Sequence, residues 1–334
     1  MKAISLRHIA VLLLLVAVFP FVSTAQEYYR KNKIIIKDMG DSIRAMESFG
    51  GSRNGGTWYS DAINQYAREL ADVVKVYSMI IPTSTEYYSE GLPDGWSSPQ
   101  TPVIRNIFAH MCDTVITVDV VDALALHTDE PIYARTDHHW FPRGAYYAAQ
   151  VFAKIADVPF LPLNEYTPVV IKDYVGSMYR FSKDPKVKKF PENFVYYKPK
   201  KENYTTTFVG HKMSNGKVTG ITDPYEGDFF FKYEDGSGYA YCTFMGGDTR
   251  TTHVATDVNN GRKLMIIKDS YGNAIPGYLF SSFEDIYVVD FRYFTKNIID
   301  YISEKEITDL LFVNNIQHAY AQSTAGAFIK MFNQ

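Results

Sequence analysis

The sequence predicts an α/β protein with a parallel central sheet. Short, continuously apolar runs are typical of buried strands, and they occur at Lys75–Ile81, Leu264–Lys268, Ile286–Asp290 and Leu310–Val313. Segments with helical spacing of apolar residues alternate with these runs, as in sheets whose parallel strands are joined by helices. The length of 334 residues and a hydrophobic content of 46% fit a globular protein of one large domain or two smaller ones.

The first 25 residues have the pattern of a secretory signal peptide. A basic start is followed by the apolar run Ile9–Val22, and small residues precede a cut near Ala25/Gln26. The run is shorter than the roughly 20 residues of a membrane-spanning helix, although a retained membrane anchor is the alternative. We therefore expect an exported protein, periplasmic or secreted, whose mature chain begins at Gln26.

The N-terminal half of the mature chain is expected to alternate helices and strands after an irregular start over residues 26–58. Helical spacing begins at Ser60, and Pro142 suits the first turn of a later helix. The expected helices are Ser60–Val73, Val103–Met111 and Pro142–Ala156, and the expected strands are Lys75–Ile81 and Thr114–Val118.

Residues 160–260 are expected to form a β-rich insertion in a single domain that spans residues 26–334. Short strand-like runs there are separated by Gly, Pro, Asn and Asp, a pattern typical of antiparallel strands. The expected strands are Thr205–Val209, Phe229–Tyr233 and Tyr239–Phe244, and the helices expected after them are Tyr271–Leu279, Thr295–Ser303 and Ala319–Met331.

Charge and cysteine content exclude several classes of protein. With 34 basic and 37 acidic residues the net charge is -3, which argues against a nucleic-acid binder with a broad cationic face. Only Cys112 and Cys242 are present, too few for a disulfide framework. They form either one bridge or two buried thiols, and neither has the setting of a nucleophile.

Two short segments carry the residues of a serine nucleophile site. Ser270 follows a buried strand and precedes an expected helix, so it lies at the carboxyl edge of the sheet, where α/β folds present ligands. A serine hydroxyl needs a base to take its proton, and that imidazole needs a carboxylate to hold one tautomer. Asp137 and His139 supply both, because side chains two residues apart on an extended segment point the same way.

Other interpretations of these residues remain open. A serine after Asp269 is also a common helix N-cap, and His138-His139 is also an ordinary polar pair at a helix entrance. Paired histidines bind zinc in some proteins, but the sequence has no H-E-x-x-H motif and no second Cys/His cluster, so we predict no metal and no cofactor.

The two segments together resemble those of the DHHW family. Asp137-His138-His139-Trp140 is followed by Gly144-Ala145-Tyr146-Tyr147 and later by Lys268-Asp269-Ser270-Tyr271-Gly272-Asn273. This family is similar to the SGNH (GDSL-type) hydrolases and to the SGNH-like domains of the alginate O-acetylation proteins. The resemblance covers roughly residues 65–331 and implies an SGNH/flavodoxin-like three-layer sandwich.

The resemblance also implies roles for individual residues. Ser270 is the expected nucleophile, His139 its general base, and Asp137 the group that orients His139. The order Asp–His–Ser is permuted relative to ordinary SGNH esterases, where the serine comes first. The sequence departs from the common block in having Lys268 where a glycine is usual, and Asp-x-His in place of Asp-x-x-His. The acetylation proteins share the shorter spacing.

Several residues are candidates for the oxyanion and substrate sites. The Ser270 N–H is the first oxyanion donor considered, and Gly247 the second, although a plain β-turn explains Gly247 equally well. Asn314 or Asn315 is the third, by analogy with the Asn-containing block of SGNH enzymes. Arg292 is a candidate for a substrate carboxylate or the acyl oxygen, with a surface arginine as the alternative. The remaining candidates are Tyr271 and Trp140, as a sugar-stacking wall or as core residues.

The sequence therefore favours an exported, serine-dependent esterase or O-acetyltransferase that acts on cell-envelope or extracellular carbohydrate. It does not distinguish hydrolysis from transfer, and transfer would need a membrane-bound acetyl donor. The alternative is a non-catalytic protein of the same fold that binds glycan or assists envelope polysaccharide assembly. A metal-dependent phosphoesterase lacks the further Asp clusters that such a site requires.

Overall fold

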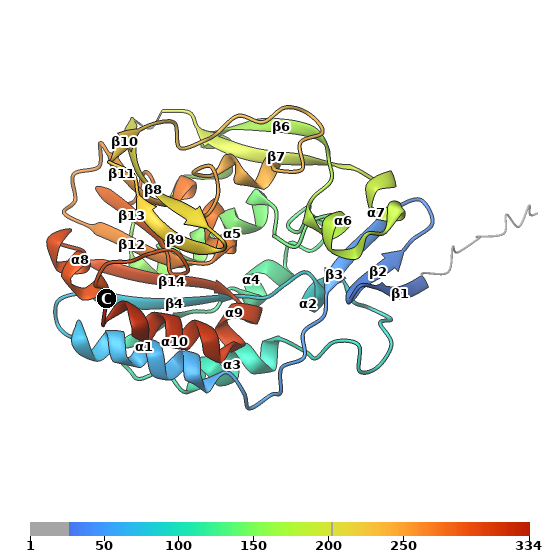
Figure 1. The fold of residues 1–334 in the computed structure, drawn as a ribbon, viewed down its shortest axis with the longest axis horizontal. Coiled ribbons are helices and arrows are strands. Elements are labelled where there is room, and N and C mark those ends of the chain that lie inside the picture. The colour runs from blue at the N-terminus through green and yellow to red at the C-terminus, as the bar shows by residue number, and fades with distance from the viewer. Residues whose placement is uncertain (1–26, 202) are drawn as a thin grey trace, which may run out of the picture.

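The computed structural model describes residues 27–201 and 203–334 (Figure 1). The expected signal peptide over residues 1–25 lies outside these residues. Within the described ranges, no helix has the length and apolar character needed to cross a membrane.

The predicted parallel sheet is present at the centre of the molecule. Nine strands of the described chain form it in the order β10-β8-β11-β13-β12-β14-β4-β5, with β9 paired to β8. Neighbouring strands from β13 to β5 are parallel, and β11, β8 and β10 continue the sheet in antiparallel fashion. The strands are β4 (Lys75–Ile81), β5 (Val115–Val118), β8 (Tyr204–Ser214), β9 (Lys217–Ile221), β10 (Tyr225–Glu226), β11 (Arg250–Thr256), β12 (Lys263–Lys268), β13 (Asp285–Asp290) and β14 (Asp309–Asn315).

Both faces of the sheet are buried, which explains the continuously apolar strands. In β12, Leu264 and Ile266 enter one core, whereas Met265 and Ile267 enter the core on the opposite face. Helix α5 (Pro142–Ala156) packs in the first core. The helices of the second core are α1 (Thr57–Glu69), α3 (Thr101–Ala109), α8 (Ile298–Glu304) and α10 (Gln322–Met331). The result is the expected three-layer sandwich.

The segment from about 160 to 260 is β-rich, but part of it belongs to the central sheet. Strands β6 (Tyr166–Tyr174) and β7 (Glu192–Pro199) form a separate antiparallel pair above the sandwich (Figure 1), and β8 and β11 extend the sheet beside β13. The strands expected at Phe229–Tyr233 and Tyr239–Phe244 are absent from this described segment. Only an isolated bridge and the 3-10 turn η2 (Ala240–Thr243) form there, because their aromatic residues pack into the core instead of pairing along a ladder.

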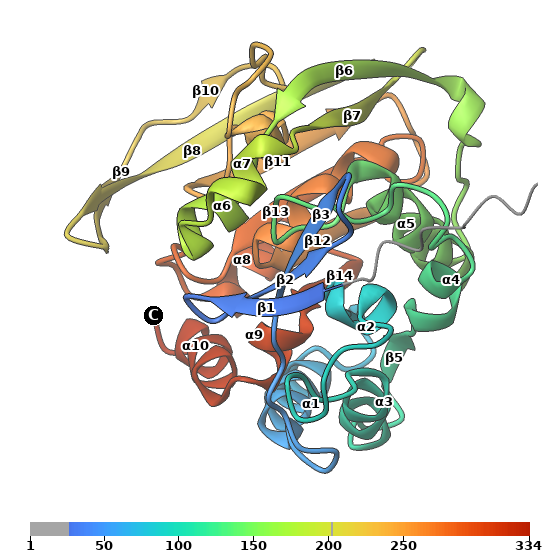
Figure 2. The same ribbon diagram turned by 90° about the vertical axis from the view of Figure 1, so that its right-hand side faces the viewer.

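The irregular start expected over residues 26–58 is wrong for its first part. Strands β1 (Glu27–Lys31), β2 (Ile34–Asp38) and β3 (Ile43–Glu47) form an antiparallel sheet. The turn between β1 and β2 places both Asn32 and Lys33 at positive φ, as tight hairpin turns require. This small sheet lies beyond the carboxyl ends of the parallel strands (Figures 1 and 2).

Two expected helices are broken. Instead of a helix over Tyr271–Leu279, the chain forms the 3-10 turns η3 (Ser270–Ala274) and η4 (Pro276–Tyr278), since Pro276 has no N–H to continue an α-helix. The helix expected over Ala319–Met331 is divided at Ala321. The remaining short helices are α2 (Thr85–Tyr88), α4 (Val121–Ala125), α6 (Ser177–Ser182), α7 (Pro185–Lys189), α9 (Ile316–Tyr320) and the 3-10 turn η1 (Leu163–Glu165).

Candidate active site

Ser270 lies at the carboxyl end of β12, as the sequence predicts. The preceding Asp269 is buried and fixes the turn, because its carboxylate accepts from the backbone N–H groups of Tyr271 and Asn315, each at 2.9 Å. Asp269 therefore ties the end of β12 to the end of β14. The serine is held at the edge where the parallel strands end.

The segment that carries Asp137 and His139 is a tight loop before α5. A β-bridge between Tyr133 and Trp140 closes it. The carboxylate of Glu192 on β7 accepts from the backbone N–H groups of Arg135 and Thr136 at 2.7–3.0 Å. The backbone of the loop is thus fixed by a carboxylate from another element, so its side chains have defined positions.

The structure brings Asp137, His139 and Ser270 together. The Ser270 hydroxyl lies 2.8 Å from Nε2 of His139, and Nδ1 of His139 lies 2.6 Å from Oδ1 of Asp137. Because a carboxylate accepts, Nδ1 carries the proton and Nε2 has the lone pair that accepts from the serine O–H. In this arrangement Nε2 of His139 is placed to take the proton of the Ser270 hydroxyl.

Asp137 is held as a carboxylate in a buried position. It also accepts from the N–H groups of His139 at 3.0 Å and Ser177 at 2.7 Å. Burial alone raises the pKa of Asp137, but the neighbouring imidazoles and these hydrogen bonds outweigh it and hold the pKa well below its usual range. Gly176 permits this approach, since a Cβ there would lie 2.3 Å from Oδ2 of Asp137.

The His139 ring is packed between two other rings. Tyr241 stacks on it at 3.8 Å between centroids with planes 7° apart, and the His138 ring lies 3.7 Å away on a 38° tilt. The Tyr241 hydroxyl donates to the backbone oxygens of Ser270 and Tyr271, both at 3.0 Å. Tyr241 therefore links the position of the imidazole to that of the serine.

His138 is a neutral side chain next to this arrangement. Burial, with the nearby His139 adding to it, lowers the pKa of His138 to about 3. Its Nδ1 pairs with Oγ of Ser177 at 2.5 Å. One ligand atom from each of Asp137, His138 and His139 lies within 4.8 Å of the others, a spacing open to a metal ion. The Nδ1 atoms of both histidines are already engaged, so the side chains present fit a proton chain better than a metal site.

The opposite side of the site is a cluster of paired charges. The buried Lys268 ammonium lies 2.8 Å from Asp290 and 3.2 Å from Asp248. The Arg292 guanidinium contacts Asp290 at 2.6 Å and Asp248 at 3.0 Å. In place of the usual glycine, Lys268 is thus one of two cations that share two carboxylates. Gly272 leaves room for the Lys268 side chain, because a Cβ at position 272 would lie 2.5 Å from Cβ of Lys268.

Three of the expected oxyanion donors are not placed to act. The N–H of Gly247 donates to the carbonyl of Phe244 at 3.1 Å. Asn314 is buried on the other side of the sheet, where its Oδ1 accepts from Tyr59. The side chain of Asn315 caps α9, and its N–H is used by Asp269. These expectations are wrong because each group already has a hydrogen-bond partner, from the local turn for Gly247 and from distant segments for Asn314 and for the N–H of Asn315. The Ser270 N–H, at the start of η3, and Arg292 remain candidates.

Of the two alternatives for Trp140 and Tyr271, the sugar-stacking wall is wrong and the core position is confirmed, because both are fully buried. Trp140 Nε1 donates to the carbonyl of Tyr271 at 3.0 Å, and the Tyr271 hydroxyl donates to the carbonyl of His138. Exposed aromatic side chains instead lie at Tyr179, which is 36% exposed, and Tyr239, which is 63% exposed. Both line the cavity into which Ser270 opens.

This cavity, which we call the triad cavity, measures about 470 Å³, within the range of about 300–1,000 Å³ usual for small-ligand sites. The sequence did not indicate Ser177 or Tyr241, which also line it. They come from segments without a motif and reach the site only through tertiary packing. Cys242 lines the cavity as well, and both it and Cys112 are free thiols.

The fold and the site together define an α/β three-layer protein with a serine at the carboxyl edge of its parallel sheet. The chain belongs to the DHHW family, whose model, described as DHHW protein, matches residues 32–289. A DHHW family protein from Eubacterium siraeum DSM 15702, known from a crystal structure, is similar at 34% identity with a TM-score of 0.81. The match covers 91% of this chain and 97% of that one.

More distant solved structures share the fold. Bacillus cereus PatB1 with a sulfonyl adduct is 18% identical with a TM-score of 0.68, over 89% of this chain and 96% of that one. A second structure of Bacillus cereus PatB1 is 20% identical with a TM-score of 0.66, over 86% and 98%. A comparison with curated proteins finds no match.

Proposed function

We propose that this protein is an exported, serine-dependent acyl-ester enzyme that acts on O-acetylated carbohydrate. The observation that carries the proposal is the hydrogen-bonded chain from Asp137 through His139 to Ser270, which ends in a cavity large enough for a sugar ester. A buried carboxylate, a single imidazole tautomer and a serine at the cavity wall are the parts that acyl transfer requires.

The proposed reaction has two halves. Ser270 Oγ forms a bond to the acyl carbon while its proton passes to Nε2 of His139. The tetrahedral oxyanion then expels the alcohol, which takes that proton and leaves an acyl-serine. In the second half a water molecule or a sugar hydroxyl attacks the acyl carbon and gives its proton to His139. Collapse of this second intermediate releases the product, and the proton returns to Ser270.

Asp137 supports both halves without itself being protonated. The positive charge that develops on His139 is stabilised by the buried carboxylate at 2.6 Å. For the oxyanion, the Ser270 N–H and the Arg292 guanidinium are the proposed donors, since both belong to the triad cavity. One such donor is worth about 100–1,000-fold in rate.

Hydrolysis and transfer differ only in which acceptor reaches the acyl-serine. Transfer to a glycan needs a donor of acetyl groups at the same side of the membrane, so the proposal includes a membrane-bound partner for that case. Export rests on the signal-like pattern of residues 1–25. The second candidate, a glycan-binding protein without turnover, predicts the same cavity but no chemistry at Ser270.

Turnover of p-nitrophenyl acetate by the mature protein and by Ser270→Ala tests the proposal. We expect release of p-nitrophenol that is lost in the variant, and mass spectrometry of the intact protein during turnover should show an acetyl group on Ser270. Adding a sugar acceptor separates the two fates of the acyl group, because transfer gives an acetylated sugar and hydrolysis gives acetate. Equal rates in both proteins, with and without acceptor and with no acetyl-serine, would reject catalysis and favour the binding role.

A further inference from the structure

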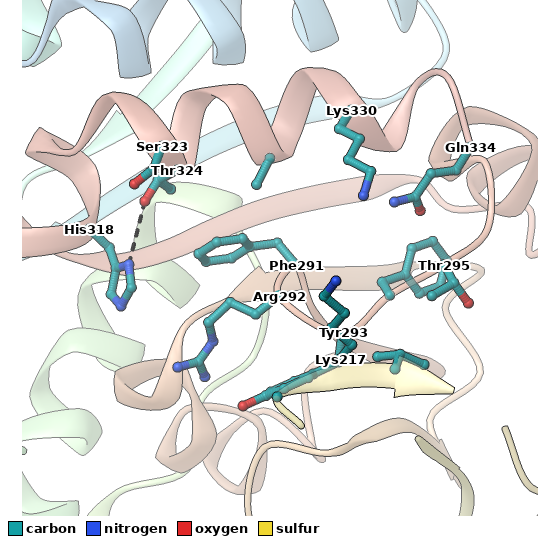
Figure 3. A pocket seen from close by; sticks show the side chains of 14 residues that line it. Lys217, Phe291, Arg292, Tyr293, Thr295, His318, Ser323, Thr324, Lys330 and Gln334 are labelled. Carbon is teal, nitrogen blue, oxygen red and sulfur yellow. Dashed lines mark hydrogen bonds between the residues drawn. The ribbon is translucent and has the colours of Figure 1, made fainter. Parts of the chain in front are cut away.

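A second cavity lies beside the triad cavity. It measures about 630 Å³ and lies between the β8–β9 turn, the chain that follows β13, and α10 (Figure 3). We call it the basic cavity after the cationic side chains of its wall, which are Lys217, Arg292 and Lys330, together with His318. Nothing in the proposed acyl transfer at Ser270 uses Lys217, Lys330 or His318.

The charges of the basic cavity are unbalanced. Lys217 and Lys330 extend into it from opposite walls (Figure 3), and no residue of its lining carries a carboxylate side chain. Across the described chain, the lysines that form ion pairs are others, and neither Lys217 nor Lys330 belongs to one. Because Asp248 and Asp290 balance Arg292, the uncompensated charge of this wall is that of Lys217 and Lys330, and a concave wall focuses the field of these two lysines on whatever enters.

Arg292 connects the two cavities, because it lines both of them. Asp290 accepts from its Nε at 2.8 Å and from its Nη2 at 2.6 Å, which fixes the plane of the guanidinium. Within the ranges that the structure describes, no hydrogen bond occupies Nη1. A rigid guanidinium with a remaining N–H pair is suited to bind a carboxylate or phosphate oxygen.

The rest of the wall suits a sugar ring that carries such an anionic group. Ser323 and Thr295 offer hydroxyl groups and Tyr293 offers ring surface, whereas the buried Thr324 already pairs with Nδ1 of His318 (Figure 3). An all-apolar ligand would leave these hydroxyl groups and the two lysines without partners. The chemistry of the wall therefore matches a polar, negatively charged chain better than a lipid or a neutral acyl group.

We propose that the basic cavity is a subsite for an anionic glycan, binding the carboxylate or phosphate group of one unit while a neighbouring unit places its ester or hydroxyl at Ser270. Only the second part of this proposal, the placing of an ester or hydroxyl group at Ser270, rests on the proposed function. Lys217 and Lys330 hold the anionic group by charge, and Arg292, which lines both cavities, marks the passage from this group to the triad cavity.

Calorimetric titration of Ser270→Ala protein tests the binding without turnover. The probes are tri-galacturonate, a glycerol phosphate trimer and neutral galactotriose. We expect one of the two anionic probes to bind at least about tenfold more tightly than galactotriose, with an advantage that shrinks as salt is raised. Which anionic probe binds more tightly distinguishes a carboxylate source from a phosphate source.

The double substitution Lys217→Gln and Lys330→Gln should remove that advantage, because both long side chains keep their polarity and lose their charge. Lys154→Gln, an exposed lysine on α5, is the matched control and should bind like the parent protein. Binding of the neutral trisaccharide as tight as that of both anionic probes, or a double variant that retains the preference, would overturn the subsite. Failure of the proposed catalysis would appear separately, as an absence of Ser270-dependent turnover with anion binding intact.

Discussion

The two walls of the triad cavity use charge in different ways. On one wall, each donor has one acceptor in sequence, from Ser270 to His139 to Asp137. On the other wall, Arg292 and Asp248 line the cavity and Lys268 and Asp290 lie buried behind them. Each cation contacts both carboxylates, so two cations and two anions form a closed cluster. We call the first the directional wall, because its hydrogen bonds all run from Ser270 towards Asp137, and the second the balanced cluster, because its charges cancel.

This difference separates a part of the site that moves a proton from a part that holds its shape. A directional chain changes its protonation during a reaction, so loss of one member should lower the rate more than the stability. A balanced buried cluster does not gain or lose charge, but removal of one member leaves an uncompensated charge behind. The two walls should therefore respond differently to single substitutions.

The largest expected effect is the fall in kcat that the substitution Asp137→Asn causes. The amide no longer stabilises a positive His139 and favours the wrong imidazole tautomer, so kcat for p-nitrophenyl acetate should fall by about 10³–10⁴-fold. Asp285→Asn is a matched control, because Asp285 pairs with His253 at 2.6 Å outside the cavity lining. The control should keep its kcat. A fall of less than about tenfold in Asp137→Asn would mean that the first wall is not a proton chain.

The next effect is on stability, from Lys268→Met. Loss of the ammonium leaves Asp290, which is buried, and Asp248 with one cation between them, and the free energy of unfolding should decrease by about 3–5 kcal/mol. Urea denaturation measures the change. Lys263→Met removes an ion pair with the exposed Glu306 and should leave the urea midpoint almost unchanged. Equal midpoints for the two variants would contradict the role of the balanced cluster.

A smaller effect, which depends on pH, concerns Glu47 of β3, behind the directional wall. Burial, with Asp137 adding to it and His139 opposing it, raises the pKa of Glu47 from 4.5 to about 7. A raised carboxyl pKa adds stability that is complete below about pH 4.5 and is lost as the pH rises through about 7. The loss of stability is on the order of 3 kcal/mol, and Glu47→Gln, which cannot ionise, should not show it.

Urea denaturation at pH 5 and pH 8 checks the prediction. The wild type should lose more stability than Glu47→Gln between the two values, because only the wild type must ionise a buried carboxyl group. Parallel behaviour of the two proteins would show that Glu47 is not buried as an acid in solution.

The directional wall was accessible to sequence analysis, and the balanced cluster was not. Asp137 and His139 are two residues apart, and Ser270 follows a strand that is apolar throughout, so local pattern placed all three. In the sequence, Lys268 is visible only as a departure from the common SGNH block. Its role could not be predicted, because its partners Asp248 and Asp290 come from other parts of the chain. Pairing across strands has no signature in a single sequence.

The fold shows the same division. Strand β4 and helix α5 have the predicted bounds, because both faces of the strand are buried and Pro142 marks the start of the helix. The aromatic run Tyr239–Phe244 looked like a strand, yet Tyr241 and Phe244 pack into the core, with Tyr241 stacked on His139, while Tyr239 stays exposed. Apolar content predicted that this run is buried, but the way in which it is buried depends on which distant surface it meets.

The smallest expected effect would show whether the open side of the triad cavity recognises sugar. Tyr239 is 63% exposed at its edge, and a large aromatic ring kept in water at a cavity is typical of a ligand contact. Tyr239→Ala should raise KM for an O-acetylated oligosaccharide about five- to tenfold, the loss expected for about 1 kcal/mol of ring contact, with kcat nearly unchanged. Trp58→Ala, which removes a ring that is 55% exposed on α1, is the matched control and should leave KM unchanged. A fall in kcat with constant KM would instead place Tyr239 with the directional wall, since it would then act on the transition state and not on binding.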